Sequence, residues 1–459
     1  MSEVAVTSQQ DLASKYKSYP EYKDSGVEWL GTIPTHWEMW KLAHAYEVIG
    51  SGTTPPTNEE GWFGDGIPWV TTGELREIII EQTSKCITYE ALNVFSALRV
   101  HPAGSVVIAM YGATIGRLGI LGVNATTNQA CCVLTRSIHL DNKYVFYWLQ
   151  AFRDDIVRLS SGGGQPNINQ EKVASLKISA PDERHQRTIS AFLDYETARI
   201  DRLIAKQQRL IELLKEKRQA VISHAVTKGL NPDAPMKDSG VEWLGQVPEH
   251  WNVTKFGFIS NVVRGGSPRP AGDPELFDGD YSPWVTVAEI TKDEEVYLES
   301  TESFLTEKGS KQSRVFKRGT LLLSNSGATL GVPKILSIDA NANDGVVGFE
   351  KLSVNTEYAY FYLSTLTDNL RERIKQGSGQ PNLNTDIVKS IVIPLPPSGE
   401  VEAILSEIKT HRITFSVLIS KADTAIKLMQ ERRTALISAA VTGKIDLRGW
   451  TPPAEEAAA

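Results

Sequence analysis

The histidines and cysteines of this chain are too scattered to form a metal site. The three cysteines, Cys86, Cys131 and Cys132, are too few for a disulfide framework or a four-cysteine zinc site. This cysteine content is typical of a reducing, cytoplasmic environment. None of the eight histidines has metal-ligand spacing to another histidine or to a cysteine; they are His36, His44, His101, His139, His185, His224, His250 and His411.

Motifs that bind nucleotide phosphates or activate a nucleophile are also missing. Gly443-Lys444 lacks the upstream glycine of a phosphate-binding loop, and Gly162–Gly164 precedes Gln-Pro, as a turn does. The sequence contains no Gly-x-Ser-x-Gly elbow, no Asn-Pro-Pro-aromatic loop of the adenine methyltransferases and no nuclease carboxylate–lysine cluster. Asp65 and Asp280 stand beside glycine, as loop-forming residues do. We therefore expect no catalytic residue, cofactor site or metal site, and interpret the chain as a binding protein.

Length and composition indicate a globular protein of several domains. The chain has 459 residues, of which 41% are apolar and 22% charged, a balance that excludes wholesale disorder. The longest uncharged apolar stretches, such as Ser105–Tyr111, are under half of a membrane span, and the N-terminus lacks a signal pattern. A net charge of −7 argues against nonspecific coating of nucleic acid, although local basic patches remain possible.

Six sequence blocks occur twice, in the same order and at a nearly constant offset. Asp24–Gly31 recurs letter for letter as Asp238–Gly245, an offset of 214 residues. The chain therefore consists of two copies of one unit. The other matched blocks are Ile33–Trp37 with Val247–Trp251, Pro68–Thr71 with Pro283–Thr286, Gly112–Gly116 with Gly327–Gly331, Gly164–Asn169 with Gly379–Asn384, and Ala220–Thr227 with Ala435–Thr442.

The matched blocks and the segments between them differ in character. The blocks are rich in Gly, Pro and Trp, which fix turns and core positions. Arg76–Arg99 and Thr291–Arg314, in contrast, have little in common, and neither do Gly50–Gly66 and Arg264–Asp280. This pattern predicts one scaffold that carries two different surfaces, so the copies do the same job on two targets.

Each copy begins with a mixed globule. Short apolar runs at Ser105–Met110 and Thr320–Ser324 predict strands, as do Lys177–Pro181 and Ile391–Pro394, which end at proline. Helical patterns lie between these strands, for example at Lys143–Leu159 and Glu357–Ile374. The fold class is therefore α+β.

Each copy ends in a long helix. No glycine or proline interrupts residues 182–228, or residues 400–442 in the second copy. The apolar stripes need a partner, and antiparallel pairing of the two helices as a coiled coil, with a pseudo-two-fold internal repeat, provides one. Gln207 and His411 could set the register of this pair. Packing of each helix on its own globule remains an alternative. The predicted seam positions are Leu193, Ile200, Leu203, Ile204, Leu210, Ile211, Leu214, Val221 and Ile222 in the first helix, and Ile404, Ile408, His411, Phe415, Leu418, Ala422, Ala425, Met429, Arg432 and Leu436 in the second.

The duplicated blocks, in order and joined to long helices, resemble the specificity (S) subunit of type I restriction–modification enzymes. The resemblance extends from about Tyr19 to Ile445. It implies two target-recognition domains, each of which reads one half of a bipartite, asymmetric DNA target, while the helices set the unread spacer. The expected divisions are a first recognition domain at 1–181, a central long helix at 182–229, a second recognition domain at 230–399, a C-terminal long helix at 400–446 and a flexible tail at 447–459.

The resemblance also implies partners. Two methyltransferase subunits, which carry S-adenosylmethionine, would dock mainly on the helices, and two translocating nuclease subunits would use ATP and Mg. The chain itself would be non-catalytic. Its acidic balance fits this interpretation, because partner subunits can neutralise most of the DNA phosphates. Two rival functions remain open: a methyltransferase or nuclease that acts alone, and a protein-binding adaptor with a helical spacer.

Candidate DNA contacts follow from residue type and position. Gln165, Asn167, Gln380 and Asn382 carry suitable groups for adenine edges, but because they are identical in both copies we assign them to the scaffold or to backbone contacts. The basic stretch Lys308–Arg318 suits phosphate contact, although a solvated basic face is an open alternative. Trp29, Trp37, Trp243 and Trp251 are expected in the core, whereas Trp62 lies in a polar loop and is a candidate for stacking. The candidate DNA-binding residues are Thr71, Thr72, Arg76, Lys85, Arg99, Gly112, Thr114, Arg117, Arg264, Arg269, Thr286, Lys292, Lys311, Arg314, Lys317, Arg318, Gly327 and Thr329.

Overall fold

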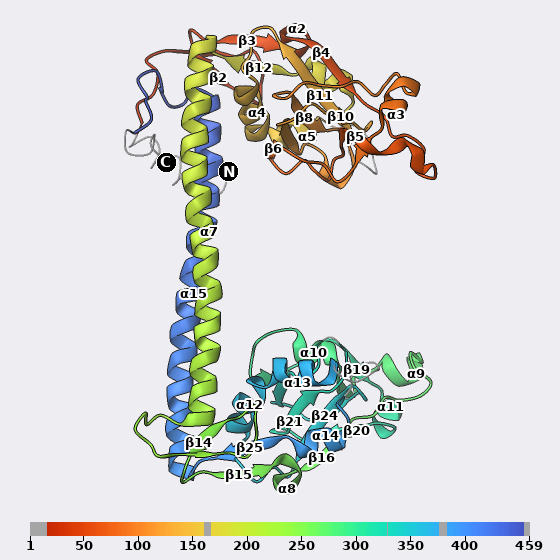
Figure 1. The fold of residues 1–459 in the computed structure, drawn as a ribbon, viewed down its shortest axis with the longest axis vertical. Coiled ribbons are helices and arrows are strands. Elements are labelled where there is room, and N and C mark those ends of the chain that lie inside the picture. The colour runs from red at the N-terminus through yellow and green to blue at the C-terminus, as the bar shows by residue number, and fades with distance from the viewer. Residues whose placement is uncertain (1–15, 160–166, 328, 376–382, 454–459) are drawn as a thin grey trace. The chain divides into compact units, whose positions relative to one another are not determined.

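The computed structural model describes residues 16–159, 167–327, 329–375 and 383–453. These residues form two compact units (Figure 1). Unit 1 contains the described residues up to Gln208 together with those from Asp423 onward, and unit 2 contains those between Arg209 and Ala422. One unit therefore combines both ends of the chain, and the other is a single internal segment.

A five-stranded sheet forms the centre of unit 1, in the order β4-β11-β8-β9-β6. All neighbouring strands are antiparallel except β6 and β9, which are parallel. Every residue of β8 and β9 is buried, which explains why their sequences are continuous apolar runs rather than alternating ones. The strands are β4 (Tyr46–Ser51), β6 (Ile78–Ile80), β8 (Val106–Ala109), β9 (Leu118–Leu121) and β11 (Cys131–Ser137).

Smaller sheets and short helices complete unit 1. A three-stranded sheet has the order β10-β5-β7, and β1–β2 and β3–β12 form two separate antiparallel pairs. The strands are β1 (Tyr22–Asp24), β2 (Thr32–Pro34), β3 (Glu38–Lys41), β5 (Phe63–Val70), β7 (Cys86–Ile87), β10 (Thr126–Thr127) and β12 (Lys177–Ala180). The helices are α2 (Leu42–Ala45), η1 (Glu60–Trp62), α3 (Tyr89–Val94), η2 (Gly112–Thr114), α4 (Asn142–Ala151), α5 (Arg153–Arg158) and α6 (Gln170–Ser175).

Unit 2 repeats this arrangement, with a five-stranded sheet in the order β16-β24-β21-β22-β18 and a four-stranded sheet in the order β19-β17-β23-β20. The strands are β13 (Met236–Asp238), β14 (Gln246–Pro248), β15 (Asn252–Lys255), β16 (Asn261–Arg264), β17 (Ser282–Val285), β18 (Tyr297–Leu298), β19 (Phe304–Leu305), β20 (Arg314–Phe316), β21 (Leu321–Ser324), β22 (Pro333–Leu336), β23 (Ala340–Ala342), β24 (Val346–Glu350) and β25 (Val392–Leu395). The helices are α8 (Phe256–Ile259), α9 (Pro274–Phe277), α10 (Val287–Thr291), α11 (Glu307–Lys311), α12 (Thr356–Ser364), α13 (Thr367–Lys375) and α14 (Thr385–Ser390).

Matched aromatic residues fill the two cores. In unit 1, α4 packs on β8 and β9 and buries Tyr144 and Trp148 completely, and in unit 2 α12 packs on β21 and β22 and buries Tyr362. Trp37 and Trp251 are fully buried at matching positions, and Trp29 and Trp243 pack half-buried against these cores. The expectation that these four tryptophans belong to the core is confirmed.

Two long helices are shared between the units. α7 (Glu183–Lys228) has 46 residues and α15 (Ser398–Val441) has 44. Unit 1 holds the beginning of α7 and the end of α15, whereas unit 2 holds the end of α7 and the beginning of α15. The helices therefore run antiparallel, as the sequence predicted. Within unit 1, the Arg433 guanidinium donates to the Asp201 carboxylate at 3.0 Å across the pair.

The buried positions of α15 differ in part from the predicted seam. Ile404, Ile408, Phe415, Ala422 and Leu436 are buried as expected. Leu418 and Arg432 were predicted on the seam but are exposed, and the half-buried positions are Ile419 and Arg433 instead.

α7 shows a similar difference. Leu203 and Leu210 are exposed, whereas Ile204 and Ile211 are half-buried, as are Gln207 and His411, the two polar residues expected on the seam. Both members of each adjacent pair were predicted on the seam; the isoleucines are half-buried as expected, whereas the leucines are exposed. Within the described residues no helix is both long and apolar enough to span a membrane.

Candidate nucleic-acid interface

Four loops of unit 1 meet along one side of its sheets. β4 ends, β11 begins, β8 ends and β9 begins at this side, because Ser51 pairs with Cys132, Cys131 with Ala109, and Ile108 with Leu118. β5 and β10 also end there, where Val70 pairs with Thr127. We call this side of each unit the loop edge. In unit 1 it comprises residues 52–56, 71–77, 110–117 and 128–130.

Unit 2 presents an equivalent loop edge. β16 ends and β24 begins there, as shown by the pairing of Arg264 with Val347, and Ser324 at the end of β21 pairs with Val346. β17 and β23 end together where Val285 pairs with Ala342. The loops are residues 265–270, 286–296, 325–332 without 328, and 343–345.

The loop edges collect many of the candidate DNA-binding residues. Glu77 N donates to Leu118 O and Met110 N donates to Ala130 O, so the loops of unit 1 contact one another. Gly112 and Gly327 begin the matched Gly-Ala-Thr turns with φ of 80° and 78°, which explains structurally why both copies keep glycine there. The candidates on or directly beside the loop edges are Thr71, Thr72, Arg76, Gly112, Thr114, Arg117, Arg264, Arg269, Thr286, Lys292, Gly327 and Thr329.

Four further candidates of unit 2 lie outside the loops of the loop edge. Arg314 begins β20 opposite Ala342. Lys311 precedes Gln312, whose side chain accepts from Arg269 N at 3.2 Å. Lys317 and Arg318 contact Asp339, which precedes β23, whereas the loop edge follows that strand.

In unit 1, Lys85 and Arg99 lie outside the edge loops. Lys85 lies over the Phe63 ring, with its ammonium 5.2 Å from the ring centroid. Arg99 is exposed, two residues before the His101–Ala125 bridge.

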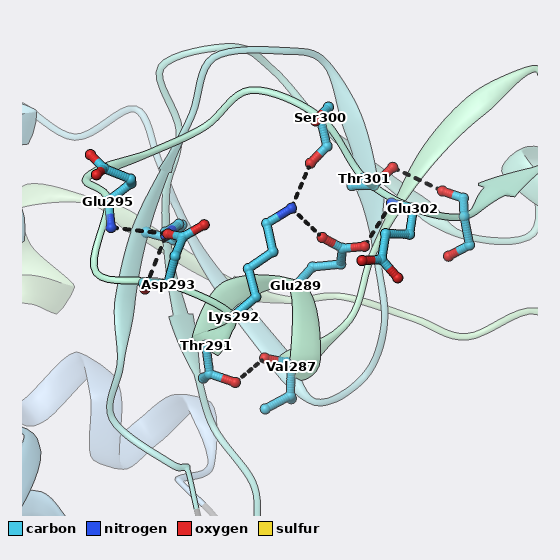
Figure 2. Close-up of polar contacts among 11 residues, drawn as sticks. Val287, Glu289, Thr291, Lys292, Asp293, Glu295, Ser300, Thr301 and Glu302 are labelled. Atoms are coloured by element: carbon cyan, nitrogen blue, oxygen red, sulfur yellow. Dashed lines mark hydrogen bonds and ion pairs between the residues drawn. The ribbon is translucent and has the colours of Figure 1, made fainter. Parts of the chain in front are cut away.

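The candidate cations of unit 2 are mostly paired with carboxylates of the same unit. In the basic stretch, Lys308 contacts Glu275, Lys311 contacts Glu307, Arg314 contacts Glu350 and Lys317 contacts Asp339, at 2.5–3.2 Å. Figure 2 shows that the Lys292 ammonium lies between the Glu289 carboxylate, at 2.9 Å, and the Ser300 carbonyl, at 3.3 Å. Each of these cations would have to exchange a carboxylate for a phosphate to bind DNA.

The candidate cations of unit 1 differ in this respect. Arg76, Arg99 and Arg117 form no ion pair with any residue that the structure describes. Arg76 donates only to the Gly73 carbonyl, at 3.2 Å. These guanidiniums are therefore available to an anionic ligand without loss of an internal ion pair.

Comparison with known families identifies both copies. The model of the type I restriction modification DNA specificity domain matches this chain twice, at residues 34–213 and 248–422. The chain belongs to the type I restriction–modification specificity family. The match confirms the resemblance seen in the sequence, including the internal repeat.

Several specificity subunits are similar over most of this chain. The MjaIX specificity subunit of Methanocaldococcus jannaschii is 24% identical over 94% of this chain and 98% of its own length. Over a shorter part, the EcoR124I/EcoR124II specificity subunit of Escherichia coli is 25% identical, covering 40% of this chain and 46% of its own length.

Solved structures share the fold. A chain from work on complex assembly and conformational transition of the type I R-M system has a TM-score of 0.70 at 15% identity, covering 90% of this chain and 99% of the other. The HsdS subunit of Thermoanaerobacter tengcongensis has a TM-score of 0.52 at 15% identity, over 90% and 98%. These comparisons support the two-domain fold of a specificity-family chain.

Sequence analysis missed a pair of matching carboxylates, one at the loop edge of each unit. Glu74 accepts from the backbone N–H of Thr71 at 2.9 Å, from the Thr71 hydroxyl, and from the Ser84 hydroxyl at 2.7 Å. Burial alone would raise the pKa of Glu74, but these bonds from Thr71 and Ser84 hold it below its usual value. Glu289 occupies the matching place in unit 2, accepts from Glu302 N at 2.7 Å, and is buried. In both copies a glutamate stands three residues after the matched threonine, Thr71 or Thr286. This repeated spacing could have identified Glu74 and Glu289 from the sequence.

Other sequence candidates have structural explanations or lie outside the described residues. Trp62 donates to Glu59 at 2.7 Å and packs edge-on against Phe95, so these two contacts within unit 1 hold its ring. Asn167 forms a bridge with Tyr111. Gln165, Gln380 and Asn382 lie outside the described residues.

Neither the described metal-ligating side chains nor the buried thiols form a reactive cluster. Among the described residues, no three side chains of His, Cys, Asp or Glu come together as a metal site. Cys131 and Cys132 are buried in the sheet of unit 1, and burial raises the pKa of both thiols, that of Cys132 to about 12. Thiols held in the neutral form are poor nucleophiles.

Proposed function

We propose that this specificity-family chain is a non-catalytic DNA reader, in which each unit reads one half of a bipartite, asymmetric target. The observation that carries this proposal is the duplicated loop edge. The same strand ends recur in both units, but they carry different side chains, such as Ser51 at the end of β4 and Arg264 at the end of β16. A retained scaffold with divergent loops is what two different half-sites require.

The long helices would set the spacer between the half-sites. Helices of 46 and 44 residues are roughly 65–70 Å long at 1.5 Å per residue. An antiparallel pair with a regular buried seam resists bending better than a flexible linker, so it holds one separation. A constant length of the helix pair would give a constant distance between the two half-sites, as the dimer geometry does in dimeric DNA-binding proteins.

The helices would also bind two methyltransferase subunits, and two nuclease–translocase subunits would join the complex. Large apolar side chains of unit 2 remain exposed on both helices, including Leu213 and Val417 at 45% and 47%. Contiguous exposed apolar surface marks protein interaction sites, so a partner that docks here would cover these side chains. The partners would bring S-adenosylmethionine, ATP and Mg.

The test of this function exchanges recognition segments. Replacing residues 47–180 with the matching segment of a relative should change one half of the methylated sequence and leave the other half intact. The matched control replaces residues 261–395 and should change only the opposite half. Single-molecule sequencing of the host genome reads both halves of the methylated sequence at once.

Three results would count against the proposal. Changes in both halves after one exchange would contradict separate readers. Methyl transfer by the purified chain alone would support a catalytic protein instead. Absence of sequence-selective DNA binding, even with the methyltransferase subunits present, would support an adaptor.

A further inference from the structure

One side-chain hydrogen bond recurs at the loop edge of both units. In unit 1 the Thr54 hydroxyl donates to the Gln129 amide oxygen at 2.5 Å. In unit 2 the Ser267 hydroxyl donates to the Asp344 carboxylate at 2.5 Å. Each bond joins the loop that follows the outermost strand of the sheet to the turn that precedes its neighbour.

Strand register shows that the two bonds are equivalent. Ser51 pairs with Cys132 in unit 1, and Arg264 pairs with Val347 in unit 2. Each donor lies three residues after the first member of its pair, and each acceptor lies three residues before the second. Thr54 therefore corresponds to Ser267, and Gln129 corresponds to Asp344.

Close backbone packing fixes these loops. A Cβ atom on Gly52 would lie 1.7 Å from the Thr127 carbonyl oxygen, and one on Gly265 would lie 2.2 Å from the Asn343 carbonyl oxygen. Gly52 N donates to the Thr127 hydroxyl at 3.1 Å, and Gly266 N donates to Ala342 O at 2.9 Å. The paired side chains are thus held in place before any ligand arrives, which lowers the entropic cost of binding.

The chemistry at these equivalent positions differs between the units. Gln129 is exposed and neutral, and its amide N–H groups donate to no described residue. Asp344 is half-buried and flanked by the exposed Arg264 and Arg269. The hydrogen bond from the Ser267 hydroxyl, then that from the backbone N–H of Asp344, and then these two guanidiniums keep the pKa of Asp344 below its usual value, so the carboxylate is charged at neutral pH.

We propose that Gln129 and Asp344 are specificity-determining residues, each for the half-site read by its own unit. This inference rests on the proposed function. A glutamine amide matches the donor and acceptor of an adenine edge, and a carboxylate accepts from the amino group of cytosine. The Thr54 and Ser267 hydroxyls act as positioning groups, because each leaves its acceptor with a second lone pair or oxygen for a base.

The test uses variants that keep the shape and the acceptor of the hydrogen bond. Gln129→Glu and Asp344→Asn are isosteric, so Thr54 and Ser267 retain their partners. The full chain is assembled with its methyltransferase subunits, and DNA is selected from libraries randomised in one half-site at a time. We expect Gln129→Glu to change base preference at least tenfold at one or two positions of one half, and Asp344→Asn to do so only in the other half.

Matched controls make the same chemical change elsewhere. Gln82→Glu alters an exposed glutamine after β6, and Asp339→Asn alters an exposed aspartate before β23. Both controls should leave base preference unchanged. Thr54→Val and Ser267→Ala remove only the positioning hydroxyl, and they should weaken the preference at the same base positions as the neighbouring variant.

Two outcomes would overturn the inference. Unchanged base preference in both variants would show that other residues read the bases. Uniform loss of binding across all sequences would show that these residues contact the DNA backbone or support the loop. The proposed function is not affected by either outcome if the unaltered complex still selects a bipartite sequence. If the unaltered complex selects no sequence, the proposed function itself is rejected.

Discussion

The charge partners of single residues decide which side chains a ligand can use. Sequence analysis identified Arg314 and Lys317 as candidates from their basic neighbourhood, but their carboxylate partners, Glu350 and Asp339, are distant in the sequence. Only the folded chain brings them together, so the sequence could not predict which cations are already paired. The turn at Gly112, in contrast, could be predicted from residue type. Glycine stands at the matched position Gly327 too, and both adopt the left-handed backbone that glycine tolerates.

Replacing Arg314 with alanine tests phosphate contact. If Arg314 binds a phosphate, Arg314→Ala should weaken DNA binding and reduce the slope of log K against log salt by about 0.9. Glu350→Gln should have the opposite effect on affinity, because it releases the guanidinium from an ion pair at 3.2 Å. Binding titrations at four salt concentrations measure both slopes, and equal slopes for all three proteins would clear Arg314 of phosphate contact.

Replacing Glu74 with glutamine tests its support of the loop edge. The ionised carboxylate accepts bonds from Thr71 and Ser84, so Glu74→Gln should lower the free energy of unfolding by about 1–2 kcal/mol at pH 7. The folded pKa is lowered, so this contribution is complete above the ordinary glutamate pKa of about 4.3 and is lost as the pH falls through the folded value. Urea unfolding of the wild-type protein and the Glu74→Gln variant at pH 7 and pH 3 measures the difference in free energy of unfolding. This difference should be smaller at pH 3, and an equal difference at both pH values would contradict a stabilising role of the ionised Glu74.

At the scale of elements, short apolar runs identified strands of both units, and the heptad pattern identified the long helices. The strands expected at Ser105–Met110 and Ile391–Pro394 appear as β8 and β25, whose bounds differ from the prediction by one residue at each end. The helix seam was less predictable. Leu418 and Ile419 are adjacent and equally apolar, so only the packing partner decides that Leu418 is exposed and Ile419 is half-buried.

Truncation of two helix positions tests the observed seam. Phe415 is 6% exposed and Leu418 is 43% exposed on the same helix. Phe415→Ala should lower stability by about 3 kcal/mol because it leaves a cavity, whereas Leu418→Ala should change it by less than about 0.5 kcal/mol. Thermal unfolding of the two variants measures the difference, and a larger loss for Leu418→Ala would restore the seam predicted from sequence.

At the scale of the whole molecule, the duplicated blocks predicted two similar globules and a pair of shared helices. The predicted antiparallel pairing also brings the end of the chain back to unit 1, but the sequence could not predict which residues meet there, because sequence distance does not specify a packing partner. Tyr144, for example, donates to the carbonyl of Val441 at 3.2 Å, a contact between residues 297 positions apart.

Lengthening both helices tests their proposed role as a spacer. Insertion of seven residues after Leu210 in α7 and after Ala422 in α15 preserves the heptad pattern and adds roughly 10 Å of helix. The preferred spacer between half-sites should increase by about three base pairs, at 3.4 Å for each pair. Selection from DNA libraries of variable spacer length measures this preference, and an unchanged optimum would remove the role of the helices. Insertion in α7 alone is the control and should disrupt binding, because it mismatches the pair.

The composition of unit 1 from both ends of the chain has a consequence for biosynthesis. The core of unit 1 includes Leu436, Val441 and Leu447, which are synthesised after all of unit 2. Unit 2 is continuous from Arg209 to Ala422, so it can close while translation is still in progress. The N-terminal globule, although made first, must wait with part of its apolar surface uncovered until the final segment emerges. A premature stop codon late in the message would therefore damage the first domain rather than the second.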